Sequence, residues 1–301
     1  MIVFVVAAAT AVPALAYLVW TSNGGWLLPA LLGALSAVAL LYAWRFGLHP
    51  RLRADKQGIT VVNPFSSRRF DWEDIRVVAP GENGLVIAST EATVEAWCVQ
   101  KSNFAARRGK LTRADRVTRE LLDLLEEHDP PLEDEETGLR IRRARPDESR
   151  LLTRLERAAS EEALSHLFPP EEHPYPVTAI TRRWRRLLRD PRVRIYLLEH
   201  DDDPVGFVAF DADTVRHVGV LPDHTRRGYG SALVEFAAQE IFADGAPNAH
   251  LWVLVGNAGA RAFYATLRWR ETADRRDCEF PPAPPEMRLE RRNPTAPRRS
   301  L

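Results

Sequence analysis

Three kinds of hydrophobic pattern follow one another along the chain. The first 46 residues hold two uncharged apolar runs, separated by the short polar sequence TSNGG. Short runs of alternating polar and apolar residues continue to about residue 99, and an amphipathic helical pattern closes that stretch. From about residue 139 onward, strand-like and helix-like patterns alternate. Because each of these three hydrophobic patterns is typical of a different kind of folded unit, the sequence predicts a multidomain protein.

The two apolar runs predict an all-α transmembrane helical hairpin over residues 1–46. Each run is close to the roughly 20 residues that a helix needs to cross the hydrocarbon core of a bilayer. Arg45, Arg51 and Arg53 follow the second run, and no lysine or arginine precedes it. Basic residues favour the cytoplasmic side, so we expect a multi-pass protein of the cell membrane with two helices and cytoplasmic soluble domains.

Two other interpretations of this segment stay open. The sequence Ala-Leu-Ala at residues 14–16 is typical of a signal-peptidase site, although the basic segment that opens a signal peptide is missing. The two runs would also suit buried helices of a soluble core, but the second run has no polar face.

Residues 47–127 predict a small β-rich split barrel with a C-terminal helix. The strand patterns GITVV, LVIAS and ATVEAWCVQ are separated by turn residues such as Asn63 and Pro64. The closing helix is predicted to begin at Thr112, which can cap it together with Asp115 three residues later. Four apolar residues of that helix fall on one face: Val117, Leu121, Leu124 and Leu125.

This order of elements resembles the bacterial pleckstrin-homology-like family, whose members occur beside membrane spans. The resemblance rests on the GITV strand, the segment NPFSSRRFDWEDI and the closing helix. It implies a domain type rather than a defined ligand. Two basic clusters, at Arg68–Arg69 and at Arg107, Arg108 and Lys110, would each gain about 1 kcal/mol per charge beside an anionic lipid bilayer. A solvated surface on a spacer domain is the alternative, and both interpretations stay open.

Composition predicts two segments without a core of their own. Residues 128–138 are acidic and contain a Pro-Pro pair, so they are expected to form an acidic linker, and residues 292–301 are expected to be a disordered tail. The 41 basic and 41 acidic residues of the chain balance, so no nucleic-acid partner is expected. Cys98 and Cys278 lack the spacing of metal ligands, and no metal site is predicted.

Residues 139–291 predict an α+β domain. A strand LRIRRA and two helical patterns are followed by VRIYLLEH, VGFVAF and DTVRHVGV, which predict three antiparallel strands. A glycine-containing turn then leads into a helix over residues 228–243. The buried strand AHLWVLV comes next, a further helix is predicted to begin at Asn257, and EMRLE is predicted to be a last edge strand.

The glycine turn is the strongest chemical feature of the sequence. Gly228 and Gly230 permit close approach of the backbone, and the N–H groups of residues 226–231 are expected to converge at the positive end of a helix dipole. Such a turn is typical of a phosphate-binding site. It lacks both the Lys-Ser/Thr ending of a P-loop and the three glycines of a dinucleotide-binding fingerprint.

The same residues resemble the GNAT superfamily of acetyltransferases. Residues 225–230, TRRGYG, are similar to the family's pyrophosphate loop, Gln/Arg-x-x-Gly-x-Gly/Ala, with Thr225 departing at the first position. NAGARAFYATLRW is similar to the second cofactor motif, although Arg268-Trp269 replace its terminal Gly-Phe. The resemblance implies acetyl-CoA as a co-substrate. The residues that it implies in binding are Val218, Gly219, Val220, Arg226, Arg227, Gly228, Tyr229, Gly230, Ser231 and Asn257.

The resemblance also implies direct attack of an amine on a thioester held between two splayed strands. Tyr264 takes the position of the family's acid, where a phenol with a pKa near 10 can protonate the leaving thiolate; a core aromatic residue is the alternative. His217 is a candidate base at neutral pH, but strand alternation places it opposite Val218, and an ordinary surface or core histidine is the alternative. Asp211 and Asp213 are further candidates.

An acidic wall for a cationic acceptor is a separate hypothesis, and a solvated loop is its alternative. The residues concerned are Glu161, Glu162, Glu171, Glu172 and His173.

The sequence therefore predicts a membrane-anchored N-acyltransferase that moves an acetyl group from acetyl-CoA to an unknown amine acceptor, a small molecule or a protein. One alternative is a non-catalytic protein that senses acyl-CoA while its middle domain contacts lipid or a partner. Another is a membrane scaffold with a degenerate GNAT domain, which the departures at Thr225 and Arg268-Trp269 would suit.

Overall fold

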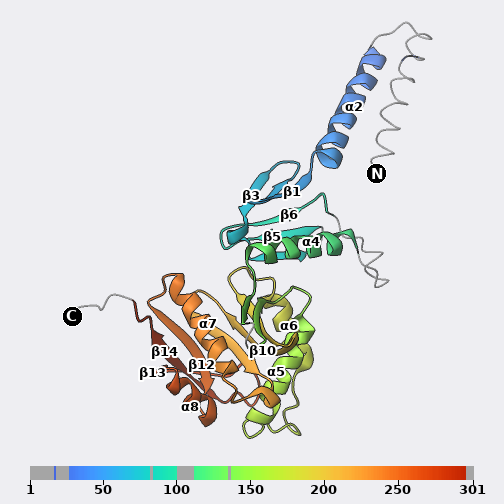
Figure 1. Ribbon diagram of the computed structural model, residues 1–301. Coiled ribbons are helices and arrows are strands. Elements are labelled where there is room, and N and C mark those ends of the chain that lie inside the picture. Colours follow the sequence, from blue (N-terminus) through green and yellow to red (C-terminus); the bar gives the residue numbers. More distant parts are fainter. Residues whose placement is uncertain (1–16, 18–26, 82–83, 100–111, 135–136, 296–301) are drawn as a thin grey trace. The chain divides into compact units, whose positions relative to one another are not determined.

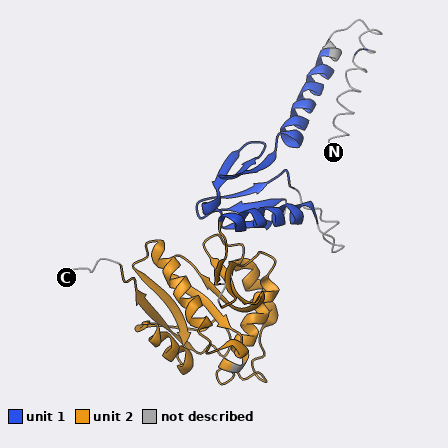
Figure 2. Ribbon diagram, viewed as in Figure 1, with its two compact units in different colours: residues 1–128 blue, residues 129–301 orange. Residues whose placement is uncertain are grey.

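The computed structural model describes residues 17, 27–81, 84–99, 112–134 and 137–295. The chain divides into two compact units, residues 1–128 and residues 129–301 (Figure 2). Each unit has its own core, and each is described by itself below.

One helix in the described part of the chain is long and apolar enough to cross a bilayer. Helix α2 spans Leu27–Ala43 and continues as a π-helical turn, η1, at Trp44–Leu48 (Figure 1). The stretch that meets the length and composition of a span is Ala30–Leu48, and little of it is buried. The first predicted membrane helix lies outside the described residues apart from Tyr17, so the two-helix hairpin is not confirmed.

The rest of the first unit consists of two three-stranded antiparallel sheets and one helix. Their strands follow the chain as simple meanders, in the orders β1-β2-β3 and β4-β5-β6. This arrangement does not confirm the split barrel that the sequence predicts. The elements are β1 (Arg51–Asp55), β2 (Gly58–Val62), β3 (Ser67–Asp71), the short helix η2 (Trp72–Asp74), β4 (Val77–Pro80), β5 (Leu85–Ala88), β6 (Thr93–Ala96) and α4 (Arg113–His128).

Helix α4 closes this unit as the sequence predicts. Thr112 and Asp115 cap its start: the Thr112 N–H and hydroxyl both donate to Asp115 Oδ2 at 2.7 Å, and the Asp115 N–H donates to Thr112 Oγ1 at 3.3 Å. Leu121 and Leu125 are buried in the shared core with Ile59 of β2. The amphipathic period of the sequence therefore becomes the packed face of the helix.

The second unit is an α/β fold built on one eight-stranded sheet in the order β13-β14-β12-β11-β10-β9-β8-β7. Neighbouring strands are antiparallel except β11 and β12, which are parallel. The strands are β7 (Leu132–Asp134), β8 (Leu139–Arg143), β9 (Arg194–His200), β10 (Asp203–Phe210), β11 (Thr214–Val220), β12 (Asn248–Leu254), β13 (Arg270–Asp277) and β14 (Pro285–Arg292). The helices are α5 (Ser149–Leu164), α6 (Val177–Leu187), the short η3 (Pro222–His224), α7 (Tyr229–Ala243) and α8 (Ala258–Thr266).

Helices cover both faces of the sheet, so the central strands are apolar on both sides. In β10, Val208 and Phe210 face the core under α7, whereas Phe207 and Ala209 face the core under α5 and α6. This alternation explains why VGFVAF is an almost continuous apolar run. The two cores fix β10 and β11 in the centre, where the candidate site lies.

Two parts of the second unit differ from the prediction. The segment 128–138, predicted to be a linker, contributes β7, which pairs with β8 at the edge of the sheet. The EMRLE strand is not at the edge, because β13 pairs with its outer side. The β13 sequence, RETADRRD, carries no apolar alternation, and this is why its strand is not predicted. Strand β14 extends to Arg292, the first residue of the predicted tail.

Candidate functional site

The glycine turn has the backbone geometry of an anion-binding loop. Arg226 and Gly228 both have positive φ angles, +59° and +88°, and Gly228 is the N-cap of α7. The first N–H groups of a helix have no partner within it, and no side chain caps this helix within the described residues. The backbone N–H groups of Gly228, Tyr229, Gly230 and Ser231, which the sequence predicts to converge, therefore lie together at the positive end of α7.

The two motifs that are predicted to bind a cofactor meet at Gly230. A β-carbon built there would lie 3.5 Å from Cζ of Phe263 and 3.9 Å from Cγ2 of Val220. Phe263 belongs to α8 and Val220 ends β11, so three separate parts of the sequence come together at one position. At Gly228, by contrast, an added β-carbon would meet nothing within 4 Å, so this side of the loop is open.

Strands β11 and β12 separate beside this loop. Their parallel pairing comprises Thr214 with His250 and Val215 with Leu251, although β11 continues to Val220 and β12 to Leu254. Beyond these two pairs, β11 remains paired only with β10, and β12 remains paired only with β14. The result is a wedge between β11 and β12 whose facing edges are unpaired within the described residues.

The register shows which backbone groups face this wedge. The Leu221 N–H donates to Val205 O at 2.8 Å. In an antiparallel pair every second residue forms such hydrogen bonds, so Gly219 also bonds to β10. Val218 and Val220, which lie between these residues, therefore turn their N–H and C=O groups away from β10 and toward the wedge. On the other side, the Val255 N–H donates to Pro285 O at 2.9 Å, which turns the backbone of Leu254 toward the wedge. Buried backbone groups require partners, so the wedge suits an extended ligand that carries amides.

A bulge at Arg216 sets the orientation of the following side chains. Ala209 pairs with His217 and Phe210 with Val215, so β11 has one extra residue at this point. Without the bulge, His217 would share the face of Val215. With it, His217 turns toward α6, where its ring lies 5.3 Å from that of Trp184.

Gly219 has a packing role in addition to its place in the predicted binding strand. A β-carbon there would lie 2.7 Å from Phe207 Cε1 and 3.1 Å from Ala159 Cβ. The absence of a side chain therefore lets β11 lie close to β10 and α5.

Tyr264, the predicted acid, lies in the core beneath α7 and is 8% exposed. Its ring packs near Phe263, with a centroid distance of 5.2 Å, and near Trp269 at 6.3 Å. Burial raises the pKa of the phenol to about 12. The group is therefore protonated throughout the physiological range, as an acid must be before it acts.

The candidate base His217 is neutral at pH 7. Burial is the main cause that holds its pKa well below 6.5, and the positive charges of Arg183, Arg216 and Arg276 act in the same direction. Asp211 is less suitable, because its carboxylate accepts from Arg216 Nε at 2.6 Å and from the Thr214 N–H at 3.0 Å. Asp213 is exposed and bonds the Thr214 hydroxyl.

The predicted acidic wall does not form a buried cluster. Glu161 pairs with Arg157 at 2.8 Å on the surface of α5, and Glu171 and Glu172 are exposed. His173 is half-buried. The side chain of Glu162 lies outside the described part of the structure.

A polar cluster that sequence reasoning missed lies between α5 and α6, near His217. Glu156 accepts from Trp184 Nε1 at 2.6 Å and from the Arg183 guanidinium at 2.5 Å. Arg183 lies 5.6 Å from the Phe280 ring centroid. The Tyr175 hydroxyl is buried and finds no partner among the described residues, and burial together with the Glu156 charge raises its pKa. These residues are far apart in the sequence, so no spacing indicates them.

Asn257 caps α8, and its Oδ1 accepts from the Ala260 N–H at 3.0 Å. The structure thus gives this predicted cofactor residue a local structural role. Arg226 and Arg227 are both exposed beside the loop.

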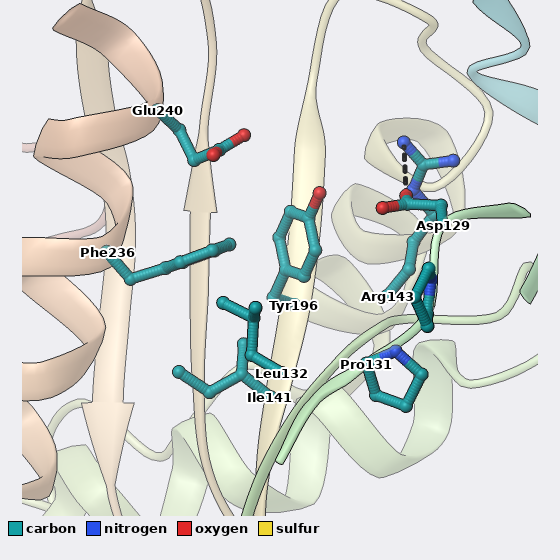
Figure 3. Close-up of a pocket in the computed structure, with 9 residues that line it drawn as sticks. Asp129, Pro131, Leu132, Ile141, Arg143, Tyr196, Phe236 and Glu240 are labelled. Carbon is teal, nitrogen blue, oxygen red and sulfur yellow. Dashed lines mark ion pairs between the residues drawn. The ribbon is translucent and has the colours of Figure 1, made fainter. Parts of the chain in front are cut away.

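A cavity of about 110 Å³ lies elsewhere in the second unit, lined by residues of α7, β8, β9 and the segment 129–132 (Figure 3). Segment 129–132 covers it, Tyr196 and Phe236 form its aromatic wall, and Arg143 lies 3.6 Å from Asp129 across its rim (Figure 3). It contains none of the predicted site residues.

Two family models match the chain. Residues 149–268 match the model described as Acetyltransferase (GNAT) family, and residues 49–100 match the one described as Bacterial PH domain. A GNAT acetyltransferase domain and a bacterial PH-like domain are thus both present. The GNAT match supports acyl transfer from an acyl-CoA. No curated protein matches the chain.

Several solved structures are similar to about half of this chain. PaiA N-acetyltransferase from Thermoplasma acidophilum, in complex with coenzyme A, is 13% identical over 52% of this chain and 99% of that one, with a TM-score of 0.42. The ribosomal-protein-S18-alanine N-acetyltransferase from Escherichia coli is 20% identical over 54% and 99%, with a TM-score of 0.42. An acetyltransferase from Thermus thermophilus is 23% identical over 52% and 97%, with a TM-score of 0.38. At these values the similarities support no inference about function.

Proposed function

We propose that this protein is a membrane-anchored N-acetyltransferase that transfers an acetyl group from acetyl-CoA to an amine. The observation that carries the proposal is the wedge between β11 and β12, which opens beside an uncapped helix N-terminus. An acyl-CoA has both chemistries in one molecule, since its pyrophosphate suits the N–H groups of the loop and its pantetheine amides suit the strand edges.

The residues take the following roles in this proposal. Gly228, Tyr229, Gly230 and Ser231 supply backbone donors to the pyrophosphate, while the exposed Arg226 and Arg227 add positive charge.

The backbone of Val218 and Val220 aligns the pantetheine arm and polarises the thioester carbonyl. The amine attacks that carbonyl, the carbon–sulfur bond breaks, and Tyr264 donates a proton to the departing thiolate. The proton that the amine loses passes to a base.

The anchor is the candidate span Ala30–Leu48, preceded by the first apolar run. Acetyl-CoA is available in the cytoplasm, and the basic residues after the span favour that side for both units. Fusion of a reporter after Leu301 should therefore report a cytoplasmic C-terminus. A periplasmic result would contradict the orientation.

A non-catalytic acyl-CoA sensor is the second candidate, because the loop and the wedge that suit an acyl-CoA do not by themselves require turnover. It would bind acetyl-CoA without turnover, so binding and turnover must be measured separately.

Binding is tested by calorimetry of acetyl-CoA with the full-length chain in detergent, comparing Gly228→Glu with Gly245→Glu. The two glycines are matched: they have φ angles of +88° and +92°, each has open space at the β-carbon, and they flank opposite ends of α7. Both variants carry the same backbone strain, on the order of 1–2 kcal/mol. Only Gly228→Glu places a side chain and a negative charge in the loop.

We expect Gly228→Glu to weaken binding at least about tenfold, equivalent to 1.4 kcal/mol, and Gly245→Glu to bind like the wild type. Equal binding by all three proteins would contradict the cofactor site. A folded wild type that does not bind acetyl-CoA would contradict both candidate functions.

A further inference from the structure

Phe65 is the most exposed large hydrophobic side chain in the described part of the chain, at 74%. It lies in the turn between β2 and β3. By contrast, Phe70, near the far end of β3, is buried and only 3% exposed. An isolated apolar residue at a surface is ordinary, so the reason for its position must come from its surroundings.

The turn that carries Phe65 is held in place by Asn63. The Asn63 N–H donates to Ser66 O at 2.8 Å and closes the turn. Its side chain donates to Glu95 O at 2.8 Å and accepts from the Trp97 N–H at 3.1 Å, which ties the turn to β6. Asn63 is itself buried. Phe65 is therefore presented by a fixed turn.

Phe65 also contacts the end of the candidate span. Its ring lies 5.3 Å from that of Phe46, edge to face, and the Arg45 guanidinium lies 5.2 Å from its centroid. Both partners belong to η1, within Ala30–Leu48. The exposed Trp44 and Leu48 flank these partners, at 49% and 68%.

Basic residues accompany this aromatic cluster. Arg51 lies three residues after the end of the span, and Arg53 lies two residues further along β1; both are exposed. Neither forms an ion pair with another described residue. Aromatic and basic side chains at the end of an apolar helix are typical of the headgroup region of a bilayer, where each basic charge gains about 1 kcal/mol beside anionic lipid.

We propose that the Asn63–Ser66 turn rests in the headgroup region of an anionic bilayer, with Phe65 inserted beside the end of the span. The proposal rests on the proposed membrane anchor. It assigns the bilayer as the occupant because the surface continues the span and carries positive charge. Together, span and turn would give the PH-like domain two points of membrane contact.

The test uses the full-length chain in nanodiscs of anionic lipid that contain a spin-labelled lipid as quencher. An environment-sensitive fluorophore is attached to Ser66→Cys in a Cys98→Ser, Cys278→Ser background, which leaves Phe65 in place. Two comparison sites are labelled in the same background. Leu35→Cys lies on the span, and Glu120→Cys lies on α4, where Glu120 is exposed. Each label is measured with and without Phe65→Glu.

We expect strong quenching at Leu35 and Ser66, little at Glu120, and loss of the Ser66 quenching alone in Phe65→Glu. Quenching at Leu35 without quenching at Ser66 would overturn the proposal and leave the anchor intact. Absence of quenching at Leu35 would overturn the anchor and this proposal together. A Ser66 signal that is shielded but unquenched, and that depends on protein concentration, would assign the surface to a second copy and overturn the lipid contact.

Discussion

Val215 and Leu251 form the last residue pair between β11 and β12 within the described residues. The bulge at Arg216 lies immediately beyond this pair and turns His217 toward α6. One interruption in β11 thus lies where the pairing of the two strands ends and turns the next side chain toward α6. The site depends on the backbone of this strand more than on any single side chain.

Gly219→Ala should destabilise the second unit by about 1–3 kcal/mol, because the new methyl group would overlap Phe207 in a packed core. The measurement is urea unfolding followed by tryptophan fluorescence. Gly259→Ala is the control: its β-carbon would meet only Asn257 Oδ1, at 3.8 Å, in the first turn of α8, so it should be neutral or stabilising by up to about 1 kcal/mol. Equal stability of the two variants would contradict the close-packing role.

Tyr264→Phe should lower kcat by about 10²-fold or more, the usual contribution of a general acid, while acetyl-CoA binding stays close to the wild-type value. Because the pKa of the phenol is raised to about 12, Tyr264 should contribute no limb to the activity profile below pH 10. Steady-state kinetics and calorimetry check both statements. Wild-type turnover by Tyr264→Phe would remove the acid role, and absence of turnover in the wild type would favour a sensor.

The same pKa has a consequence for stability at alkaline pH. The folded state keeps the Tyr264 proton up to about pH 12, whereas the unfolded state releases it near 10, so this contribution is present below pH 10 and is lost as the pH rises toward 12. The loss amounts to up to about 3 kcal/mol. Unfolding midpoints in urea should therefore fall more steeply from pH 9 to 11 in the wild type than in Tyr264→Phe. Parallel profiles would show that the phenol is not buried as described.

His217 should make the second unit sensitive to acid. Its pKa lies well below 6.5 in the folded state, so the unfolded state binds an extra proton once the pH falls below 6.5. Stability should decrease as the pH is lowered from 7 to 5, and His217→Gln should lose less stability over the same range. Urea midpoints at three pH values give the comparison. A larger loss in His217→Gln would indicate that the wild-type imidazole gains a proton on folding.

Asn257→Ala should destabilise α8 by about 1 kcal/mol through loss of its cap on the Ala260 N–H. Asn257→Ser and Asn257→Asp should restore the cap. Thermal unfolding and acetyl-CoA binding are measured together on all three variants. If binding follows stability, the residue acts as a cap; if Asn257→Ser is stable but binds weakly, the amide contacts the co-substrate directly.

The sequence predicts the elements whose period is strong, and it misses those that are held by pairing alone. Strands such as VGFVAF and the helix after Gly228 carry clear apolar signals, and they form where expected. Strand β13 is polar apart from one alanine and is mostly exposed, and it forms because β14 offers it a partner edge. Local preference contains no information about such a partner.

The candidate site is also predictable only in part: its motif residues can be found in the sequence, and the residues that folding brings together cannot. The glycine turn and Tyr264 lie in motifs with a recognisable spacing; the turn forms the start of α7, and Tyr264 lies in the core beneath that helix. The cluster of Glu156, Tyr175 and Arg183 is assembled from α5, a loop and α6, so only folding brings it together. The bulge at Arg216 has no mark in the sequence, because any residue can occupy that position.

Strand β7 determines the best N-terminal boundary for an expressed fragment of the second unit. A fragment that begins at Leu139 would lack Leu132–Asp134, and the outer edge of β8 would present unpaired N–H and C=O groups to other molecules. It would also lose Asp129 and Leu132, which cover the cavity against Tyr196. A fragment that begins at Asp129 retains both, so we expect it to stay monomeric where the shorter one self-associates. For expression and crystallisation, the useful boundary is therefore the one that leaves the sheet edge protected, ten residues upstream of the boundary that composition suggests.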